Sequence, residues 1–471
     1  MATGKRKSDV LLGYIRDGKM LTGRDKLNLI IQLSIPSILA QITSVVMFFI
    51  DQAMVGQLGA KASAAIGLVE SSTWLFMSMT GAASMGFSVQ VAHFIGAKDF
   101  RQARQVFRHG LLATTILSVL LALVGLAISK PLPLWLGGNA DIMADATIYF
   151  LIFVLSVPFF QLYGLSAAML KCSGNMRLPS IISGMMCVLD VVFNYFLIFH
   201  AHLGVKGAAI GTAMSIVICA LVISYFAIWR NEMLSLRRVG EKFVYVPAFI
   251  RNALKIGIPM AVQSVLMGGA QIVSTMIVAP LGTIAIAANT LGITAESLCY
   301  MPGFGIGEAA TTLIGQSIGA DRKDLCRSFA RMTLYSGMIV MAVMGGIMFI
   351  FAPEMMGLMT PVEEIRTLGS QCLRIEAFAE PMFAASIIAV SVCVGAGDTL
   401  KPAVISLCSI WLIRLTLAYA LSINYGLKGV WTAMAIELTI RGILLSVRLF
   451  RGKWMKKISE AKIEDWKIIE N

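Results

Sequence analysis

The stretch from Leu33 to Gly59, LSIPSILAQITSVVMFFIDQAMVGQLG, decides the fold. Almost every residue in it is apolar, and a run of this length is long enough to cross a lipid bilayer as a helix. Pro36 lies near its start, and one carboxylate, Asp51, lies near its far end. An aspartate inside such a helix is unfavourable unless it is paired, solvated or protonated. Asp51 is therefore either an inert residue at the helix end or a functional one.

The composition of the whole chain points to a membrane protein with many spans. Of its 471 residues, 57% are hydrophobic and only 14% are charged, whereas soluble domains carry about 25% charged residues. The net charge of +13 does not indicate nucleic-acid binding, because an excess of Lys and Arg marks the cytoplasmic loops of membrane proteins. The eight cysteines are scattered without a CxxC pair, so we expect neither a disulfide framework nor a metal centre.

Hydropathy predicts an all-α membrane protein with twelve transmembrane helices. We expect the spans near 30–55, 63–92, 109–129, 148–170, 180–200, 207–229, 255–279, 285–315, 331–352, 371–395, 402–424 and 429–450. Lys and Arg gather in the polar amino-terminus, in the loops after spans two and eight, in 230–255 and in the tail. Both termini are therefore expected in the cytoplasm. The predicted organisation is a basic terminus (1–26), a first lobe (27–230), a linker (231–254), a second lobe (255–450) and a tail (451–471).

An internal repeat underlies the two predicted lobes. A shift of 223 residues aligns Pro36 with Pro259, Gly59 with Gly282, and the sequence IGA that ends at residue 97 with the IGA that ends at residue 320. Each half holds six spans, an even number, so the second half enters the membrane from the same side as the first. Such parallel repeats are related by an axis along the membrane normal, and two of them around a cavity favour an alternating-access transporter.

These features together resemble the MATE family of multidrug and toxic-compound extrusion transporters. The resemblance rests on Ile35-Pro36, on Asp51 followed by VGQLG, on IGA before a charged helix in both halves, and on SGNMRLP and GAGDTLKP after spans four and ten. It covers about residues 25–450. It implies twelve helices in two six-helix lobes, V-shaped around a cavity, that export organic, often cationic, compounds in exchange for Na⁺ or H⁺.

Span five carries the polar residues that are expected to join Asp51. Asp190 and Asn194 are four residues apart, so they share one helix face. The family pattern here resembles Asn-x-x-x-Asn or Asn-x-x-x-Asp, and this chain departs from both. Thr212 in span six matches a threonine of the family. The resemblance implies that Asp51, Asp190, Asn194 and Thr212 bind the coupling ion, H⁺ or Na⁺. The alternative is a hydrogen-bonded pair that only joins helices.

The second half offers candidates for the substrate cavity or its gates, namely Gln263, Gln271, Glu308, Glu380 and Arg414. Some members of the family carry a glutamate in span seven, but IPMAVQSVLMGGAQ (258–271) has no acid. A Glu380–Arg414 ion pair and a role of these two in transport remain alternatives. The roles of Glu70 and Glu308 stay open.

The sequence thus predicts a secondary active efflux transporter of the cell membrane that needs no cofactor beyond its coupling ion. We expect small organic cations and the lipid bilayer as partners, and a monomer. A flippase of lipid-linked oligosaccharides is the first alternative, although such proteins tend to have a more cationic cavity. An integral-membrane enzyme or receptor is a remote alternative, because no catalytic motif is present.

Overall fold

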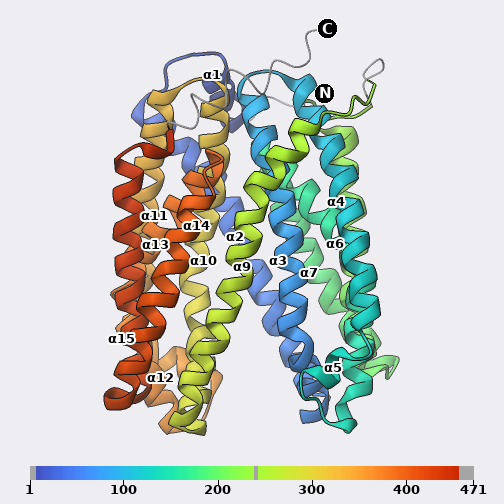
Figure 1. The fold of residues 1–471 in the computed structure, drawn as a ribbon, viewed down its shortest axis with the longest axis vertical. Coiled ribbons are helices and arrows are strands. Elements are labelled where there is room, and N and C mark those ends of the chain that lie inside the picture. The colour runs from blue at the N-terminus through green and yellow to red at the C-terminus, as the bar shows by residue number, and fades with distance from the viewer. Residues whose placement is uncertain (1–6, 238–241, 456–471) are drawn as a thin grey trace. The chain divides into compact units, whose positions relative to one another are not determined.

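The computed structural model describes residues 7–237 and 242–455, and throughout these residues the chain is helical without strands. Figure 1 shows long helices running side by side within each part of the chain. The long helices of the first half are α2 (Gly23–Gly56), α3 (Ala60–Gly96), α4 (Phe100–Ile128), α6 (Ala140–Cys172), α7 (Arg177–Tyr195) and α8 (Gly204–Tyr225). Those of the second half are α9 (Pro247–Val278), α10 (Thr283–Gly319), α11 (Lys323–Met359), α12 (Glu363–Ala377), α13 (Glu380–Gly395), α14 (Leu400–Cys408) and α15 (Leu415–Phe450).

Shorter helical elements connect or extend these helices. They are α1 (Lys7–Arg16), α5 (Leu132–Trp135), the π-helical turns η1 (Phe196–His200), η2 (Phe226–Arg230) and η4 (Ser409–Arg414), and the 3₁₀ turns η3 (Ala279–Leu281) and η5 (Lys453–Met455).

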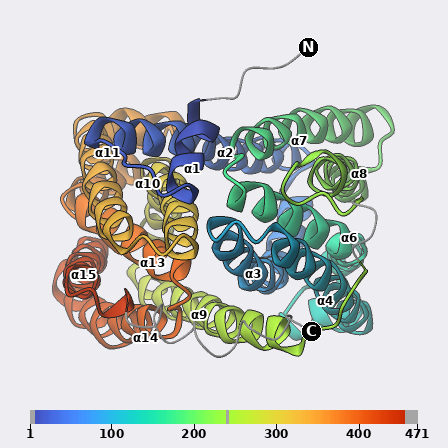
Figure 2. The same cartoon turned by 90° about the horizontal axis from the view of Figure 1, so that it is seen from above.

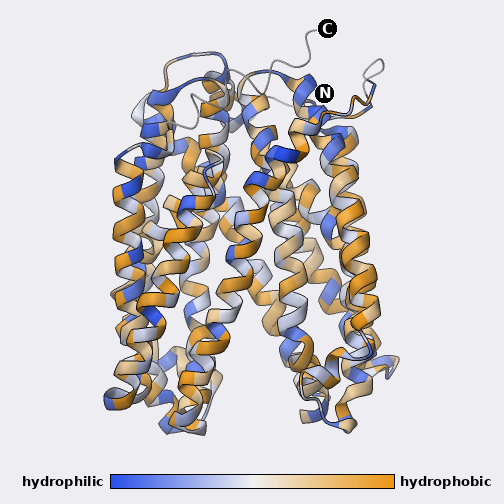
Figure 3. Cartoon of the chain, in the orientation of Figure 1, coloured by the Kyte–Doolittle hydropathy of each residue, from blue (hydrophilic) through white to orange (hydrophobic). Residues whose placement is uncertain are grey.

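Within the described residues, nine helices are long and apolar enough to cross a membrane, or ten if the bent pair α12–α13 counts as one span. In Figure 3 these long helices are mostly hydrophobic along their middle turns. One of the nine, Leu400–Phe450, is 51 residues long, far more than the roughly 20 residues that one crossing needs. Its helical geometry is interrupted at Gly426, where φ is 57° and ψ is −138°. The prediction of an all-helical membrane protein is confirmed, and the count of twelve spans stays a prediction.

The chain forms two compact units. We call residues 42–261 the N unit and residues 1–41 with 262–471 the C unit. The boundaries fall inside α2 and α9, so each of these helices begins in one unit and ends in the other. Pro36 and Pro259 lie a few residues before these boundaries. Proline in a helix interior removes a hydrogen bond and bends the helix, so the repeat places a weakened turn close to where the chain changes unit.

The backbone confirms the repeat. Where the two halves are aligned, residues with positive φ recur in pairs: Gly59 and Gly282, Lys98 and Asp321, Gly174 and Gly397, and Gly204 and Gly426. A left-handed backbone is rare for a residue with a side chain, and Lys98 and Asp321 adopt it with φ of 60° and 58°. The same turns therefore end the same helices in both halves.

The helix contacts inside each unit follow the same plan. In the N unit α6 packs against α3, α4 and α8, and α8 packs against α7. In the C unit α13 packs against α10, α11 and α15. Figure 2 views these helices end-on, with α6 among its neighbours in one unit and α13 among its own in the other.

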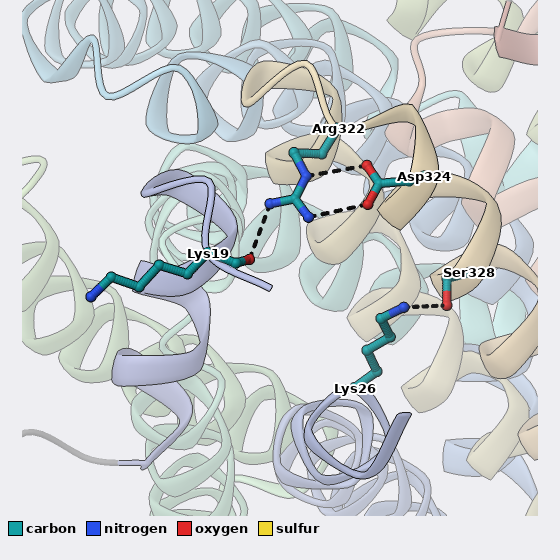
Figure 4. A network of polar contacts seen from close by, with 5 residues as sticks. All are labelled: Lys19, Lys26, Arg322, Asp324 and Ser328. Carbon is teal, nitrogen blue, oxygen red and sulfur yellow. Dashed lines mark hydrogen bonds and ion pairs between the residues drawn. The ribbon is translucent and has the colours of Figure 1, made fainter. Parts of the chain in front are cut away.

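In the C unit a polar network ties the start of the chain to α11 (Figure 4). Arg322 is held by two hydrogen bonds to Asp324, both 3.1 Å, and donates from Nη1 to the backbone oxygen of Lys19 at 3.1 Å. Lys26 Nζ donates to Ser328 Oγ at 3.0 Å. The segment between α1 and α2 is thereby fixed to the first turns of α11.

Candidate ion-coupling site

The four residues that the sequence selects as ion-coupling come together in the N unit. Asn194 lies at the centre, with Nδ2 3.0 Å from Asp51 Oδ1, 3.1 Å from Asp190 Oδ2 and 3.5 Å from Thr212 Oγ1. Asp51 comes from the second half of α2, Asp190 and Asn194 from α7, and Thr212 from α8. Three helices thus contribute to one polar group.

The close approach of α7 and α8 depends on Gly211. A Cβ atom at this position would collide with Asn194 Oδ1 and lie 3.0 Å from the backbone nitrogen of Asn194. A larger residue would therefore separate the two helices and move Asn194 away from Thr212. The sequence GAAIGTAMS, with small residues around Thr212, fits this close contact.

Burial differs among the members of the group. The Asp190 and Asn194 side chains are enclosed, with exposed fractions of 0% and 1%, whereas Asp51 and Thr212 are half-buried. Among the described residues neither carboxylate has a Lys or Arg within ion-pair distance. A buried carboxylate without a cationic partner must be hydrogen-bonded, protonated or bound to a cation.

The chemistry of the group is rich in acceptors. The amide of Asn194 has two hydrogens and three acceptors within reach, while its own Oδ1 is buried without a hydrogen-bond partner. The hydrogen bonds from this amide stabilise two carboxylates side by side. For Na⁺, a hard cation that prefers oxygen ligands, the amide would have to turn so that Oδ1 faces the carboxylates.

Sequence reasoning missed Ser215. Its Oγ lies 3.3 Å from Asp190 Oδ1 and 2.8 Å from the backbone oxygen of Thr212, and the residue is fully buried. The signal was available, because Ser215 is three residues after Thr212 and so lies on the same face of α8.

The candidates in the second half are not brought together into one site. Glu308 accepts a hydrogen bond of 3.2 Å from Gln41 of α2, Gln271 is exposed, and Gln263 is half-buried on α9. Glu380 and Arg414 do not form an ion pair with each other among the described contacts. Arg414 Nη2 instead lies 2.7 Å from Met434 Sδ, because the π-helical turn η4 directs the side chain toward α15.

Glu380 belongs to a second buried group, most of which the sequence reasoning also missed. Its members are four glutamates and two arginines of the C unit, namely Glu296, Glu376, Glu380, Glu437, Arg414 and Arg441. Glu376, Glu380 and Glu437 are fully enclosed. Glu376 and Glu380 flank a 58° bend between α12 and α13, and all four of their carboxyl oxygens lack hydrogen-bond partners.

One ion pair holds part of this second group. Arg441 Nε lies 3.2 Å from Glu437 Oε1, one turn earlier on α15, although the alignment does not make a hydrogen bond. The Arg441 guanidinium also lies over the ring of Phe383, 5.9 Å from its centroid. The i,i+4 spacing of Glu437 and Arg441 is the signal in the sequence that predicts a shared face on α15. Glu376 and Glu380 are also four residues apart, but they lie on two helices with a 58° bend between them.

Comparisons with known proteins agree with this architecture. A sequence model of the MatE family matches residues 36–196 and again residues 259–420, so the two matches begin one repeat apart. The probable multidrug resistance protein NorM of Thermotoga maritima is 26% identical over 437 residues, which cover 91% of this chain and 93% of that protein. The uncharacterized transporter YisQ of Bacillus subtilis is 26% identical over 415 residues, 86% of this chain and 90% of that one.

A solved structure shows the same fold. The Vibrio cholerae MATE transporter VcmN in the bent form matches with a TM-score of 0.86 at 19% sequence identity, over 93% of this chain and 99% of that one. The two family matches together cover well over half of the chain. The chain therefore belongs to the MATE family of multidrug efflux transporters.

Proposed function

We propose that the protein is a secondary active transporter that exports lipophilic, cationic compounds in antiport with Na⁺ or H⁺. The observation that carries this proposal is the convergence of Asp51, Asp190, Asn194 and Thr212 in one polar group inside the N unit. Two carboxylates without a cationic partner in an apolar bundle form a group that an ion or a proton stabilises.

Coupling requires that the ion binds two states of the protein with different affinity. The group draws on α2, α7 and α8, so an ion bound there ties these helices together. Of the three, α2 also continues into the C unit, because the boundary between the units falls inside it. A change in the position of Asp51 therefore acts on a helix that both units share, and in that helix Pro36 removes a backbone hydrogen bond.

The orientation of Asn194 supports H⁺ as the coupling ion. Its amide nitrogen donates toward both carboxylates. In this orientation the amide oxygen does not face the carboxylates, so a metal cation bound between them would have one oxygen ligand fewer. Na⁺ coupling would use the same carboxylates with the Thr212 hydroxyl and a rotated Asn194. Both ions would therefore use the same residues. With H⁺ the Asn194 side chain turns its NH₂ group toward the carboxylates, and with Na⁺ it turns Oδ1 toward them.

A cationic substrate requires carboxylates or aromatic faces along its path. We propose Glu308, together with its partner Gln41, for this role in the C unit, and Gln263 and Gln271 of α9 as separate candidates. Glu380 is enclosed in the second buried group and Arg414 is half-buried against Met434, and we propose both for gating rather than for substrate contact. We further propose that the protein lies in the cell membrane with both termini in the cytoplasm.

The test is efflux of a fluorescent organic cation from proteoliposomes, driven in turn by an imposed pH gradient and by an imposed Na⁺ gradient. We expect Asp51→Asn to abolish gradient-driven efflux. The matched control is Asp141→Asn, which removes an exposed carboxylate of the same unit that pairs with Lys61 at 2.9 Å and is expected to leave efflux unchanged. A wild-type rate for Asp51→Asn under both gradients would falsify the assignment of the coupling site.

A further inference from the structure

A cavity of about 270 Å³ lies in the C unit where α11 begins and α15 ends. Three arginines line it, Arg327 and Arg331 from α11 and Arg451 just after α15. The remaining lining is apolar and includes Phe450 and Trp454. This cavity is separate from both buried polar groups, and transport as proposed above makes no use of it.

The floor of the cavity is a built structure and not a loose chain end. After α15 the chain turns at Gly452, which has φ of 65° and donates its backbone N–H to Leu449 at 3.1 Å. Trp454 Nε1 donates to the same Leu449 carbonyl at 2.9 Å, and its ring is 1% exposed. The turn therefore holds Arg451 beside the two arginines of α11.

Within the described residues, the lining of the cavity carries only positive charge. No acidic residue is among those that line it in the described part of the chain. Two other carboxylates of this unit are engaged elsewhere, because Asp324 holds Arg322 and Asp398 pairs with Arg448. Three guanidinium groups that no acid of the described lining accompanies suit a phosphate, whose oxygens accept paired N–H donors in the planar geometry of arginine.

The surroundings indicate a phosphate that carries acyl chains. One turn beyond Arg331, Tyr335 packs on the ring of Phe450 with centroids 6.3 Å apart and is 53% exposed. Further along α11, Ile339 and Val343 are 64% and 58% exposed. Tyrosine is enriched where a membrane helix leaves the apolar layer. The arginines thus stand at the level of lipid headgroups, above an apolar surface that fits acyl chains.

We propose that this cavity binds the phosphodiester of an anionic phospholipid from the cytoplasmic leaflet, held by Arg327, Arg331 and Arg451. Anionic lipids are concentrated in that leaflet, and basic pockets between membrane helices bind their headgroups. The loops rich in Lys and Arg place this end of the C unit on the cytoplasmic side.

The experiment is native mass spectrometry of the full chain in detergent with equal amounts of phosphatidylglycerol and phosphatidylcholine. We expect the wild type to retain phosphatidylglycerol preferentially. The double variant Arg327→Gln with Arg331→Gln should lower this preference about thirtyfold, as the loss of two cations beside anionic lipid predicts. The matched control, Lys323→Gln with Lys401→Gln, removes two exposed cations that do not line the cavity and should keep the preference.

Two further arms separate the outcomes. The double variant Arg327→Lys with Arg331→Lys keeps the charge but loses the paired N–H donors of arginine, so it should show an intermediate preference for phosphatidylglycerol. This variant tests the proposal even if the glutamine variant fails to fold. Excess inorganic phosphate should not displace the lipid from the wild type. Equal preference in the wild type and the glutamine variant overturns the proposal. Displacement by inorganic phosphate overturns the assignment to a lipid and indicates a site for free phosphate.

Discussion

The N unit and the C unit each bury a polar group, and the two groups differ in kind. The group around Asn194 is small, and one amide joins its two carboxylates by hydrogen bonds of 3.0 and 3.1 Å. The group around Glu376 has six ionisable residues, among them Glu376 and Glu380, whose four carboxyl oxygens have no hydrogen-bond partner. In the first group Asp51 is half-buried, whereas three glutamates of the second group are fully buried.

The repeat places parts of both groups at equivalent positions. In the last span of each half, where the register is 222 residues, Ser215 corresponds to Glu437 and Thr212 to Met434. Ser215 donates to Asp190, while Glu437 pairs with Arg441. The two halves therefore place different polar residues at equivalent positions of the repeat. The N unit suits the exchange of an ion with solvent, and the C unit suits fixed charges that hold helices together.

The largest expected effect concerns the carboxylate of α7. Asp190→Asn should reduce gradient-driven efflux to the background of empty vesicles, because the site loses its enclosed anion. The double variant Asp190→Asn with Asn194→Asp returns a carboxylate to the same helix face, four residues later, and should recover part of the efflux. The measurement is the initial rate of efflux of a fluorescent cation from proteoliposomes.

The stability of the purified variants serves as the control for this comparison. Both should unfold within a few degrees of the wild type, since the hydrogen bonds of the N unit group are few. Efflux by Asp190→Asn at the wild-type rate would contradict the assignment of ion exchange to the polar group of the N unit.

The second prediction tests the C unit. Arg441→Met leaves Glu437 buried without its partner, and breaking such a pair costs about 3–5 kcal/mol. Thermal unfolding in detergent should therefore occur at a clearly lower temperature. The double variant Arg441→Met with Glu437→Leu removes both charges and should regain most of the loss, because a well-packed apolar pair replaces a buried ion pair at little cost. A double variant no more stable than Arg441→Met contradicts a structural role for this pair.

Much of this architecture could be predicted from the sequence. Apolar runs predicted the helices, and the shift of 223 residues predicted turns that the backbone repeats at Gly59 and Gly282. The convergence of Asp51 on Asn194 followed from the i,i+4 spacing in span five and from a family resemblance. These signals are local or periodic, so a single sequence contains them.

The second group could not be predicted in the same way. Glu296, Glu376 and Glu437 lie on three different helices, and their proximity depends on how α10, α12 and α15 pack. The Glu380–Arg414 ion pair, one of the two alternatives that the sequence left open, is not formed among the described contacts. A π-helical turn shifts the direction of the following side chains, and it directs Arg414 toward Met434 instead.

A smaller effect is expected from the contact between α7 and α8. Gly211→Ala should lower the free energy of unfolding by about 1–3 kcal/mol, because the added methyl group overpacks the contact with Asn194. It should also reduce efflux, since Asn194 shifts away from Asp51. The matched control is Gly184→Ala on α7, where a Cβ atom meets nothing within 4 Å, so the variant should be neutral or more stable by up to about 1 kcal/mol. Equal effects of the two substitutions would contradict the close packing of α7 on α8.

The smallest expected effect distinguishes the coupling ion. Ser215→Ala removes one neutral hydrogen bond to Asp190, worth about 1 kcal/mol, and should shift the ion concentration for half-maximal efflux about fivefold with the maximal rate unchanged. The sign depends on the ion. H⁺ coupling predicts that the loss of this donor moves half-maximal efflux to a lower proton concentration. If the Ser215 hydroxyl is a ligand of Na⁺, its loss raises the Na⁺ requirement instead. An unchanged midpoint under both gradients would show that Ser215, like Glu437 in the other unit, serves the packing of its helix rather than the ion.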